Sequence, residues 1–249
     1  MQKILARAGH GSRRSVERLI ADGRVTVNGE RITVGAQADL DVDIVEFDGA
    51  RVLPMEQLVY LAMHKPAGYV TTASDPQRRK TVMDLLPEGL PPHVLPIGRL
   101  DRDTDGLLLF SNDGEFAHRL SHPRYEVEKE YHALVEGRPP ASALEQLERG
   151  VLVDDKPTAP AQAQLAEPPP GWQARDGHTW LRLVVHEGRK RQVRRMCAAV
   201  GHPVRALVRT RIDGVPLGKL ERGTTREISG RELSALKSAV GFGDSTRAG

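Results

Sequence analysis

The stretch GRLDRDTDGLLLFSNDG, from Gly98 to Gly114, places aspartates at alternate positions directly before a glycine and an apolar run. The aspartates are Asp101, Asp103 and Asp105. The spacing D-x-D-x-D-G is that of a calcium-binding loop, but it also fits a turn that presents one carboxylate for chemistry. The residues that follow the glycine distinguish the two interpretations.

The residues after Gly106 argue against an EF-hand. Such a loop needs a bidentate glutamate at its twelfth position, which here is Asn112. It also leads into a long helix, whereas Leu107–Phe110 is a short apolar run typical of a buried strand. We therefore predict a turn that ends in a strand, with Asp101 at the tip and the Thr104 hydroxyl bonded within the turn. From this segment alone, the favoured interpretation is that the three aspartates only make the loop soluble.

The composition is that of a mildly basic protein with an aliphatic core. The 249 residues include 36 Lys and Arg against 33 Asp and Glu, a formal net charge of +3, and aromatic residues make up 4%. This length suits one large domain or two unequal ones. The single cysteine, Cys197, cannot form an internal disulfide and favours a reducing compartment. The N-terminus lacks the apolar run of a signal peptide, and no stretch approaches the ~20 apolar residues of a membrane helix, so we expect a cytoplasmic protein without membrane contact.

Residues 1–50 have a pattern of their own. MQKILARAG and RRSVERLIADG both space their apolar residues as helices do, and Ser12 can cap the second. VTVNGERITV, residues 25–34, then alternates apolar and polar residues around Asn-Gly, which is a strong hairpin signal. We predict two short helices and a β-hairpin, followed by a linker at residues 47–57.

This N-terminal unit is rich in arginine and has few acidic residues between the arginines. These arginines include Arg7, Arg13, Arg14 and Arg18. One interpretation is a solvated helix face, and the other is a surface that contacts phosphates. Arg13 and Arg14 lie near a predicted helix N-terminus, where the helix dipole favours a bound anion. We favour the phosphate-contacting surface.

From residue 58 onward, strands and helices mix without a strict β-α-β alternation, so we predict an α+β domain over residues 58–240. Residues 241–249 are expected to form a disordered tail. The patterns that predict strands are residues 58–66, 107–110 and 179–188, and those that predict helices are residues 81–87, 139–150, 189–201 and 229–240.

Two other candidate sites are interpreted as structural. His118 and His122 are four residues apart and could share a helix face, but no third ligand lies nearby, so no metal site is predicted. Cys197 lies on an apolar stripe with Val193 and Met196 and is expected to be a core residue.

Several segments resemble known families. QKILARAGHGSRRSVERLIADGRVTVNGERI resembles the S4 RNA-binding domain, and GRLDRDTDGLLLFSNDG resembles the motif G-R-L-D-x-x-T-x-G-L-L of RNA pseudouridine synthases of the RsuA/RluB type. Three further segments resemble parts of the same family, in the expected order. Residues 65–76 resemble its opening strand and loop, residues 122–131 its second motif, and residues 186–196 its third motif. The resemblance covers about residues 2–230, and ARAGHGSRR and TTASDP are most similar to the large-subunit, RluB-like branch.

The resemblance implies a fold and an activity. The fold is a small S4 domain followed by a synthase domain with a central mixed, mainly antiparallel sheet flanked by helices. The activity is the isomerisation of uridine to pseudouridine in ribosomal RNA, with 23S RNA as the expected partner. It needs no cofactor, and we expect a monomer.

The resemblance also assigns roles to residues. Asp101 is the nucleophile, and Arg194 is the family position that pairs with it, which matters because a nearby cation favours the ionised carboxylate. Tyr131 stacks on the target base and takes part in proton transfer. The target uridine must be extruded from its stack to reach these groups.

A set of cations is predicted to hold the RNA backbone around the extruded nucleotide, although a solvated face is the alternative. These residues are Arg99, Lys129, Arg189, Lys190, Arg191 and Arg195. The competing function is an S4-type RNA-binding or ribosome-assembly factor in which catalysis is not essential.

Overall fold

The computed structural model describes residues 1–8, 10, 13–53 and 57–242, and for residues 3, 7, 13 and 14 it describes the backbone alone. The chain divides into two compact units. One comprises Met1–Val59 with the short segments Gly89–Val94 and Ser111–Gly114, and the other holds the remaining residues. Within the described part, no helix has the length and apolar character needed to cross a membrane.

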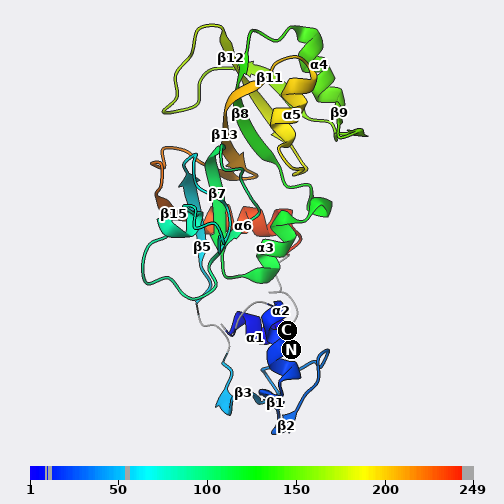
Figure 1. Cartoon of the computed structure of the whole chain (residues 1–249), viewed down its shortest axis with the longest axis vertical. Helices are drawn as coiled ribbons and strands as arrows, with labels where there is room; N and C mark the ends of the chain where they lie inside the picture. The colour runs from blue at the N-terminus through cyan, green and yellow to red at the C-terminus, as the bar shows by residue number, and fades with distance from the viewer. Residues whose placement is uncertain (9, 11–12, 54–56, 243–249) are drawn as a thin grey trace. The chain divides into compact units, whose positions relative to one another are not determined.

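The smaller unit contains two helices and a small antiparallel sheet, with strand order β2-β1-β3-β4 (Figure 1). Its core is made of aliphatic side chains from both layers, including Leu5, Val16, Ile20 and Val25. The predicted hairpin is confirmed, because Asn28 and Gly29 both have positive φ, as a two-residue turn of this kind requires. The elements are α1 Gln2–Arg7, α2 Arg13–Ala21, β1 Val25–Val27, β2 Glu30–Arg31, β3 Val45–Phe47 and β4 Ala50–Arg51.

The predicted linker at residues 47–57 is wrong in its first half. Phe47 ends β3, and Ala50–Arg51 pairs back on it as β4 through a turn at Asp48 and Gly49. The sequence FDGAR is therefore a second Asp-Gly hairpin, whose strands are too short to show an alternating pattern. Residues 54–56 lie outside the described residues.

The larger unit is built on a nine-stranded sheet, with the order β11-β12-β8-β13-β7-β5-β15 and with β14 and β6 attached to β13 and β7 (Figure 1). The β13–β7 pair is parallel, while β11–β12, β12–β8, β8–β13 and β15–β5 are antiparallel. This confirms the predicted α+β fold with a mainly antiparallel sheet. The strands are β5 Tyr60–Lys65, β6 Leu95–Ile97, β7 Asp105–Ser111, β8 Lys129–Glu136, β11 Gln162–Ala166, β12 His178–Val185, β13 Val204–Ile212, β14 Val215–Pro216 and β15 Thr225–Glu227.

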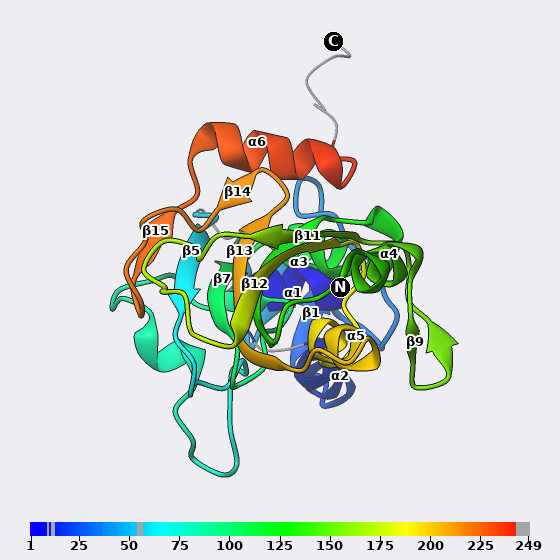
Figure 2. The same cartoon turned by 90° about the horizontal axis from the view of Figure 1, so that it is seen from above.

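Helices cover both faces of this sheet, and Figure 2 shows α5 and α6 on opposite sides of it. On one face, Phe116 of α3 and Leu236 of α6 pack with Leu107, Val208 and other residues. On the other face, α4 and α5 pack on alternate residues of β8 and β12. The remaining elements are α3 Gly114–Ser121, α4 Ala141–Arg149, α5 Gln192–Ala199, α6 Gly230–Ala239, the 3-10 turns η1 Val82–Leu85 and η2 Pro123–Tyr125, and the hairpin β9 Leu152–Val153 with β10 Lys156–Pro157.

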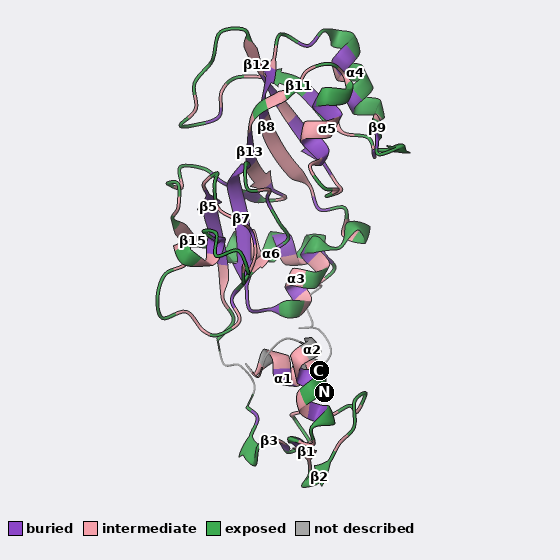
Figure 3. Cartoon of the chain, viewed as in Figure 1, coloured by how far each residue is buried: buried purple, intermediate pink, exposed green. Residues whose placement is uncertain are grey.

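The strand β7 is buried along its whole length, as Figure 3 shows, which confirms the interpretation of Leu107–Phe110 as a core strand. Cys197 is also buried in the core, as predicted. The predicted tail at residues 241–249 is wrong at its start, because Phe242 packs against the core and the Arg119 guanidinium lies 4.3 Å from its ring centroid. Residues 243–249 lie outside the described residues.

Gly106 allows β7 and β13 to lie side by side. Its φ is +113°, and it is the register partner of Arg209 in the parallel pair. A Cβ atom on Gly106 would lie 2.5 Å from the Arg209 backbone nitrogen and closer still to the Arg209 carbonyl oxygen. The glycine after the aspartates is therefore required by strand packing.

Replacement of Gly106 by alanine should lower the free energy of unfolding by about 3 kcal/mol, because the new Cβ must displace the β13 backbone at a position that already has positive φ. Gly201→Ala is the matched control, since Gly201 has φ +84° and no heavy atom would lie within 4 Å of its Cβ. Urea denaturation of both variants measures the difference. Equal losses would mean that the contact with Arg209 has no energetic weight.

Candidate active site

The Asp101 loop joins β6 to β7 and is closed by a backbone hydrogen bond from Thr104 N to the carbonyl oxygen of Asp101, with a length of 3.1 Å. The predicted hydrogen bond of the Thr104 hydroxyl is not found. This hydroxyl is buried and has no hydrogen-bond partner among the described residues. The turn is therefore formed by the main chain, and the side chain of Lys65 also binds it.

Lys65 at the end of β5 is completely buried and holds this loop. Its ammonium group donates to the carbonyl oxygens of Thr104 at 2.7 Å and Pro66 at 3.1 Å. Burial lowers the pKa of Lys65 to about 8, although Asp105, Asp103 and Asp101 oppose this shift. A buried cation fixed to main-chain oxygens makes the loop a rigid support for Asp101.

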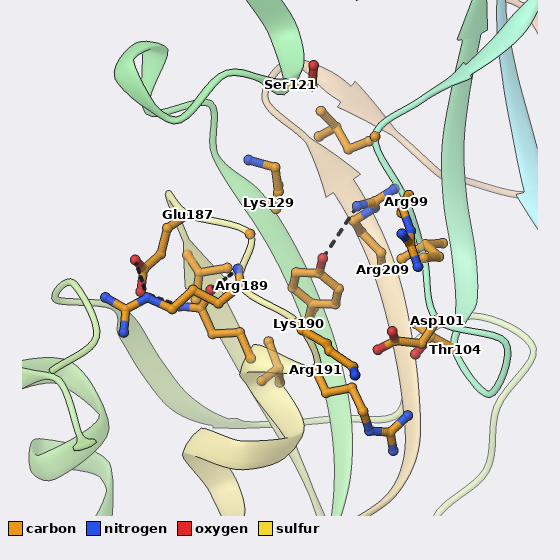
Figure 4. A pocket seen from close by; sticks show the side chains of 18 of the residues that line it. Arg99, Asp101, Thr104, Ser121, Lys129, Glu187, Arg189, Lys190, Arg191 and Arg209 are labelled. Carbon is orange, nitrogen blue, oxygen red and sulfur yellow. Dashed lines mark hydrogen bonds and ion pairs between the residues drawn. The ribbon is translucent and has the colours of Figure 1, made fainter. Parts of the chain in front are cut away.

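Asp101 lines a pocket of about 460 Å³. Figure 4 shows this pocket with Asp101 and Arg99 on the loop before β7, Lys129 on β8 and Arg209 on β13. Tyr131, also on β8, lines the same pocket. Lys129 and Tyr131 are two residues apart on one strand and therefore point to the same face of the sheet. Three segments distant in sequence thus converge on one cavity, which also includes the loop that precedes α5.

Arg209 is a pocket residue that the sequence analysis missed. It is the register partner of Tyr131 across the β8–β13 pair, and its Nη1 donates to the Tyr131 hydroxyl at 3.4 Å. The irregularity in β13 immediately after Arg209 is typical of strands next to a site. The available signal was weak: Arg209 follows the apolar run ALV, residues 206–208, but the polar Thr210 and Arg211 come next.

Arg194 lies near the loop, but its ion pair is with Asp103. Its Nη2 is 3.3 Å from an Asp103 carboxylate oxygen and donates to the Asp103 carbonyl oxygen at 2.7 Å. Arg191 adds two hydrogen bonds of 2.9 Å to the same carboxylate. No direct ion pair of Arg194 with Asp101 is found in the described part of the chain, and Arg194 is not among the residues that line the pocket.

Burial raises the pKa of Asp103, but Arg191 and Arg194 outweigh this effect, and the pKa of Asp103 is lowered overall. Burial lowers the pKa of Arg194, and the charges of Asp103 and Asp101 oppose that shift. The field of Asp101 therefore reaches Arg194 without a direct contact. Asp103, which the sequence analysis left without a role, connects α5 to the Asp101 loop.

Asp105 is part of a separate buried cluster. One of its carboxylate oxygens lies 2.5 Å from His64 Nε2, and the other accepts from Arg222 Nε at 3.2 Å. Of the three aspartates in the opening motif, Asp101 therefore remains as the one that faces the pocket.

The other cations that were predicted to hold the RNA backbone differ in their contacts and in their exposure. Arg189 lines the pocket, but its guanidinium is bound by Glu187 and by the carbonyl oxygens of the β10 strand. Arg195 forms an ion pair with Asp154. Lys190 and Arg99 line the pocket and are exposed. These two are the predicted cations best placed to meet a ligand at the entrance.

Two family models match the chain: the RNA pseudouridylate synthase model at residues 59–199 and the S4 domain model at residues 2–42. The chain belongs to the RNA pseudouridylate synthase family. Asp101, Tyr131 and Arg194 all fall within the matched region of this synthase, whereas Arg209 lies beyond it.

Relatives of this synthase cover nearly its whole length. Ribosomal large subunit pseudouridine synthase B of Bacillus subtilis is 42% identical over 243 residues, 98% of this chain and 97% of the relative. The protein of the same name from Salmonella typhi is 39% identical over 247 residues, 96% of this chain and 82% of the relative. A crystal structure of a pseudouridylate synthase shares 28% identity with a TM-score of 0.65, covering 94% of this chain and 98% of that chain.

Of the arginines predicted to form a basic surface on the S4 unit, Arg18 is exposed on α2. The side chains of Arg7, Arg13 and Arg14 lie outside the described residues. Within the described part, no group of three or more His, Cys, Asp or Glu is placed to hold a metal ion, and the rings of His118 and His122 lie 5.4 Å apart without a third partner of that kind.

Lys129 is the titratable cation of the pocket wall. Its ammonium donates to the Val127 carbonyl oxygen at 2.9 Å. Burial, assisted by the charge of Arg209, lowers the pKa of Lys129 to about 8. The ammonium is charged below this pH and becomes neutral as the pH rises through it.

We expect the affinity of the synthase for RNA to fall as the pH rises through about 8, because Lys129 loses its charge there. Lys129→Arg keeps a cation at this position, so its affinity should fall less over the range of about pH 6.5 to 9. Fluorescence anisotropy with a labelled RNA measures both curves. Lys65 titrates in both proteins, so the difference isolates Lys129, and superimposable curves would contradict the assignment.

Proposed function

We propose that this synthase isomerises uridine to pseudouridine in large-subunit ribosomal RNA, with Asp101 as the nucleophile. The observation that carries the proposal is the convergence of Asp101 and Tyr131, from a loop and a strand distant in sequence, on one pocket. Relatives named ribosomal large subunit pseudouridine synthase B, about as long as this chain, support the choice of RNA. Ribosomal RNA as the substrate is consistent with a cytoplasmic enzyme, and we propose that it acts as a monomer.

The pocket takes an extruded nucleotide. A uridine inside folded RNA cannot present its sugar to Asp101, so the nucleotide must leave its stack at a cost of a few kcal/mol. The cavity of about 460 Å³ lies within the range of small-molecule sites. Tyr131 offers a flat aromatic face on which the base stacks, and base–aromatic stacking offsets part of the cost of extrusion.

The chemistry needs a nucleophile and proton transfer, and it consumes no co-substrate. The Asp101 carboxylate attacks C1′, the C1′–N1 bond breaks, and its electron pair stays on the uracil ring. The ring turns, C5 forms a bond to C1′, and the Asp101–C1′ bond breaks and returns its pair to the carboxylate. C5 then loses its proton and N1 gains one, which completes the isomer.

The remaining assigned residues act around this step. Arg194 helps to keep Asp103 ionised through their ion pair and holds the loop that carries Asp101. Arg99 and Lys190, which are exposed at the pocket, hold the phosphates on either side of the extruded nucleotide. Arg191, Arg195 and Arg189 widen this basic surface, and the S4 unit, with Arg7, Arg13, Arg14 and Arg18, docks on a structured part of the RNA.

Replacement of Asp101 by asparagine should abolish pseudouridine formation while RNA binding stays within about twofold, because the amide cannot act as the nucleophile but leaves the phosphate contacts intact. Asp155→Asn is the control, since it makes the same chemical change at an exposed turn between β9 and β10. Product is measured on unmodified ribosomal RNA, and affinity by filter binding. An active Asp101→Asn variant would contradict the role of Asp101.

Loss of the gene should remove pseudouridine from one or a few positions of large-subunit RNA and leave small-subunit RNA unchanged. Chemical mapping of pseudouridine in cellular RNA, with and without the gene, measures this. Restoration by the wild-type gene but not by the Asp101→Asn gene is expected. If the maps are identical although the protein binds ribosomal RNA, the chain is an RNA-binding or ribosome-assembly factor.

A further inference from the structure

Arg209 has a buried donor that is unused within the protein. The residue is 3% exposed, and its Nε donates to the carbonyl oxygen of Leu107 at 2.8 Å. Its Nη1 donates to the Tyr131 hydroxyl. Its Nη2 is buried, and no described residue offers it a hydrogen-bond acceptor. A buried guanidinium donor without a partner costs free energy, so its retention calls for an acceptor from outside the chain.

The position of this donor identifies where the acceptor comes from. Arg209 lines the same pocket as Asp101 and Lys129 (Figure 4). Its guanidinium carbon lies 5.9 Å from the centroid of the Tyr131 ring, and its contact is with the hydroxyl at the edge of that ring. A base stacked on the face of that ring therefore brings its own edge to the guanidinium. The edge groups of uracil that accept hydrogen bonds are the carbonyl oxygens O2 and O4.

We propose that Arg209 is a catalytic residue whose Nη2 donates a hydrogen bond to a carbonyl oxygen of the target uracil. This inference rests on the proposed function and adds a residue to it. When the C1′–N1 bond breaks, the electron pair left on the ring spreads over N1, O2 and O4. A donor held in place in a water-poor site stabilises that charge as it develops.

The sheet holds Arg209 rigidly enough for this role. Its backbone lies in register with Tyr131 on one side and with Gly106 on the other, so the donor, the stacking ring and the end of the Asp101 loop belong to adjacent strands. The side chain is fixed at Nε by Leu107, which leaves little freedom for the guanidinium. Donors that are fixed before the reaction need no reorganisation during it.

The first test is the rate of conversion of bound RNA. The substrate is a synthetic RNA carrying the uridine identified by mapping, under single-turnover conditions. Arg209→Gln should lower the rate by about 10²- to 10³-fold while the Kd for RNA stays within about twofold. Arg205→Gln is the control, because this substitution removes the same charge from the exposed start of β13, where Arg205 pairs with Glu136. A wild-type rate for Arg209→Gln would overturn the proposal.

The second test separates substrate contact from a structural role. The target uridine is replaced by 2-thiouridine or 4-thiouridine, because sulfur accepts hydrogen bonds more weakly than oxygen. One of the two should slow the wild-type enzyme by about tenfold or more and should have no further effect on Arg209→Gln, since interacting groups are not additive. If Arg209→Gln does not fold, Arg209→Lys takes its place in this comparison.

Two outcomes of the thiouridine series would overturn the proposal: equal effects of sulfur in wild type and variant, or no effect of either thiouridine on the wild type. Failure of the proposed function is seen separately, since wild-type enzyme would then form no pseudouridine in the unsubstituted RNA of the same series.

Discussion

The close approach of β7 and β13 at Gly106 is the constraint on which the site depends. It is a parallel pair in a mainly antiparallel sheet, and its register sets Gly106 against Arg209. On the far side of β13, Arg209 is set against Tyr131. Because Asp101 is five residues before Gly106 on a loop that Lys65 anchors, this strand contact positions the proposed nucleophile relative to the pocket wall that carries Tyr131.

The pocket concentrates positive charge in a small, partly buried space. Lys129 and Arg209 form one wall, and the lowered pKa of Lys129 reflects burial first and the proximity of Arg209 second. Like charges brought together in this way destabilise the folded protein, and they persist where a ligand compensates for them. In the proposed reaction a nucleotide compensates for this charge in two ways: its phosphates contact the cations, and its ring carries negative charge when the glycosidic bond breaks.

Patterns local in sequence predicted most of the fold. The Asn-Gly hairpin, the buried strand after Gly106 and the helix predicted at residues 229–240 each depend on a few neighbouring residues, and each is found as expected. The roles of Lys65 and Arg209 could not be read in this way, because their partners are set by strand register between distant segments. A lysine or arginine in an apolar strand shows that something must satisfy its charge, but the sequence does not show which loop supplies the acceptor.

The arginines before and within α5 also have partners that the sequence does not reveal, and these partners affect how the arginines can bind RNA. The sequence presents Arg189, Arg191 and Arg195 as an open phosphate-binding cluster, yet each has a carboxylate partner in the fold. The Arg191–Asp103 pair is half exposed, and exposed pairs of this kind contribute only about 0–1 kcal/mol. An RNA phosphate can therefore replace Asp103 at Arg191 at little cost, while the buried Lys65 keeps the loop in place. In the proposed function, the exposed pairs hold the cations in position before RNA binds, and the buried contacts of Lys65 keep Asp101 aligned afterwards.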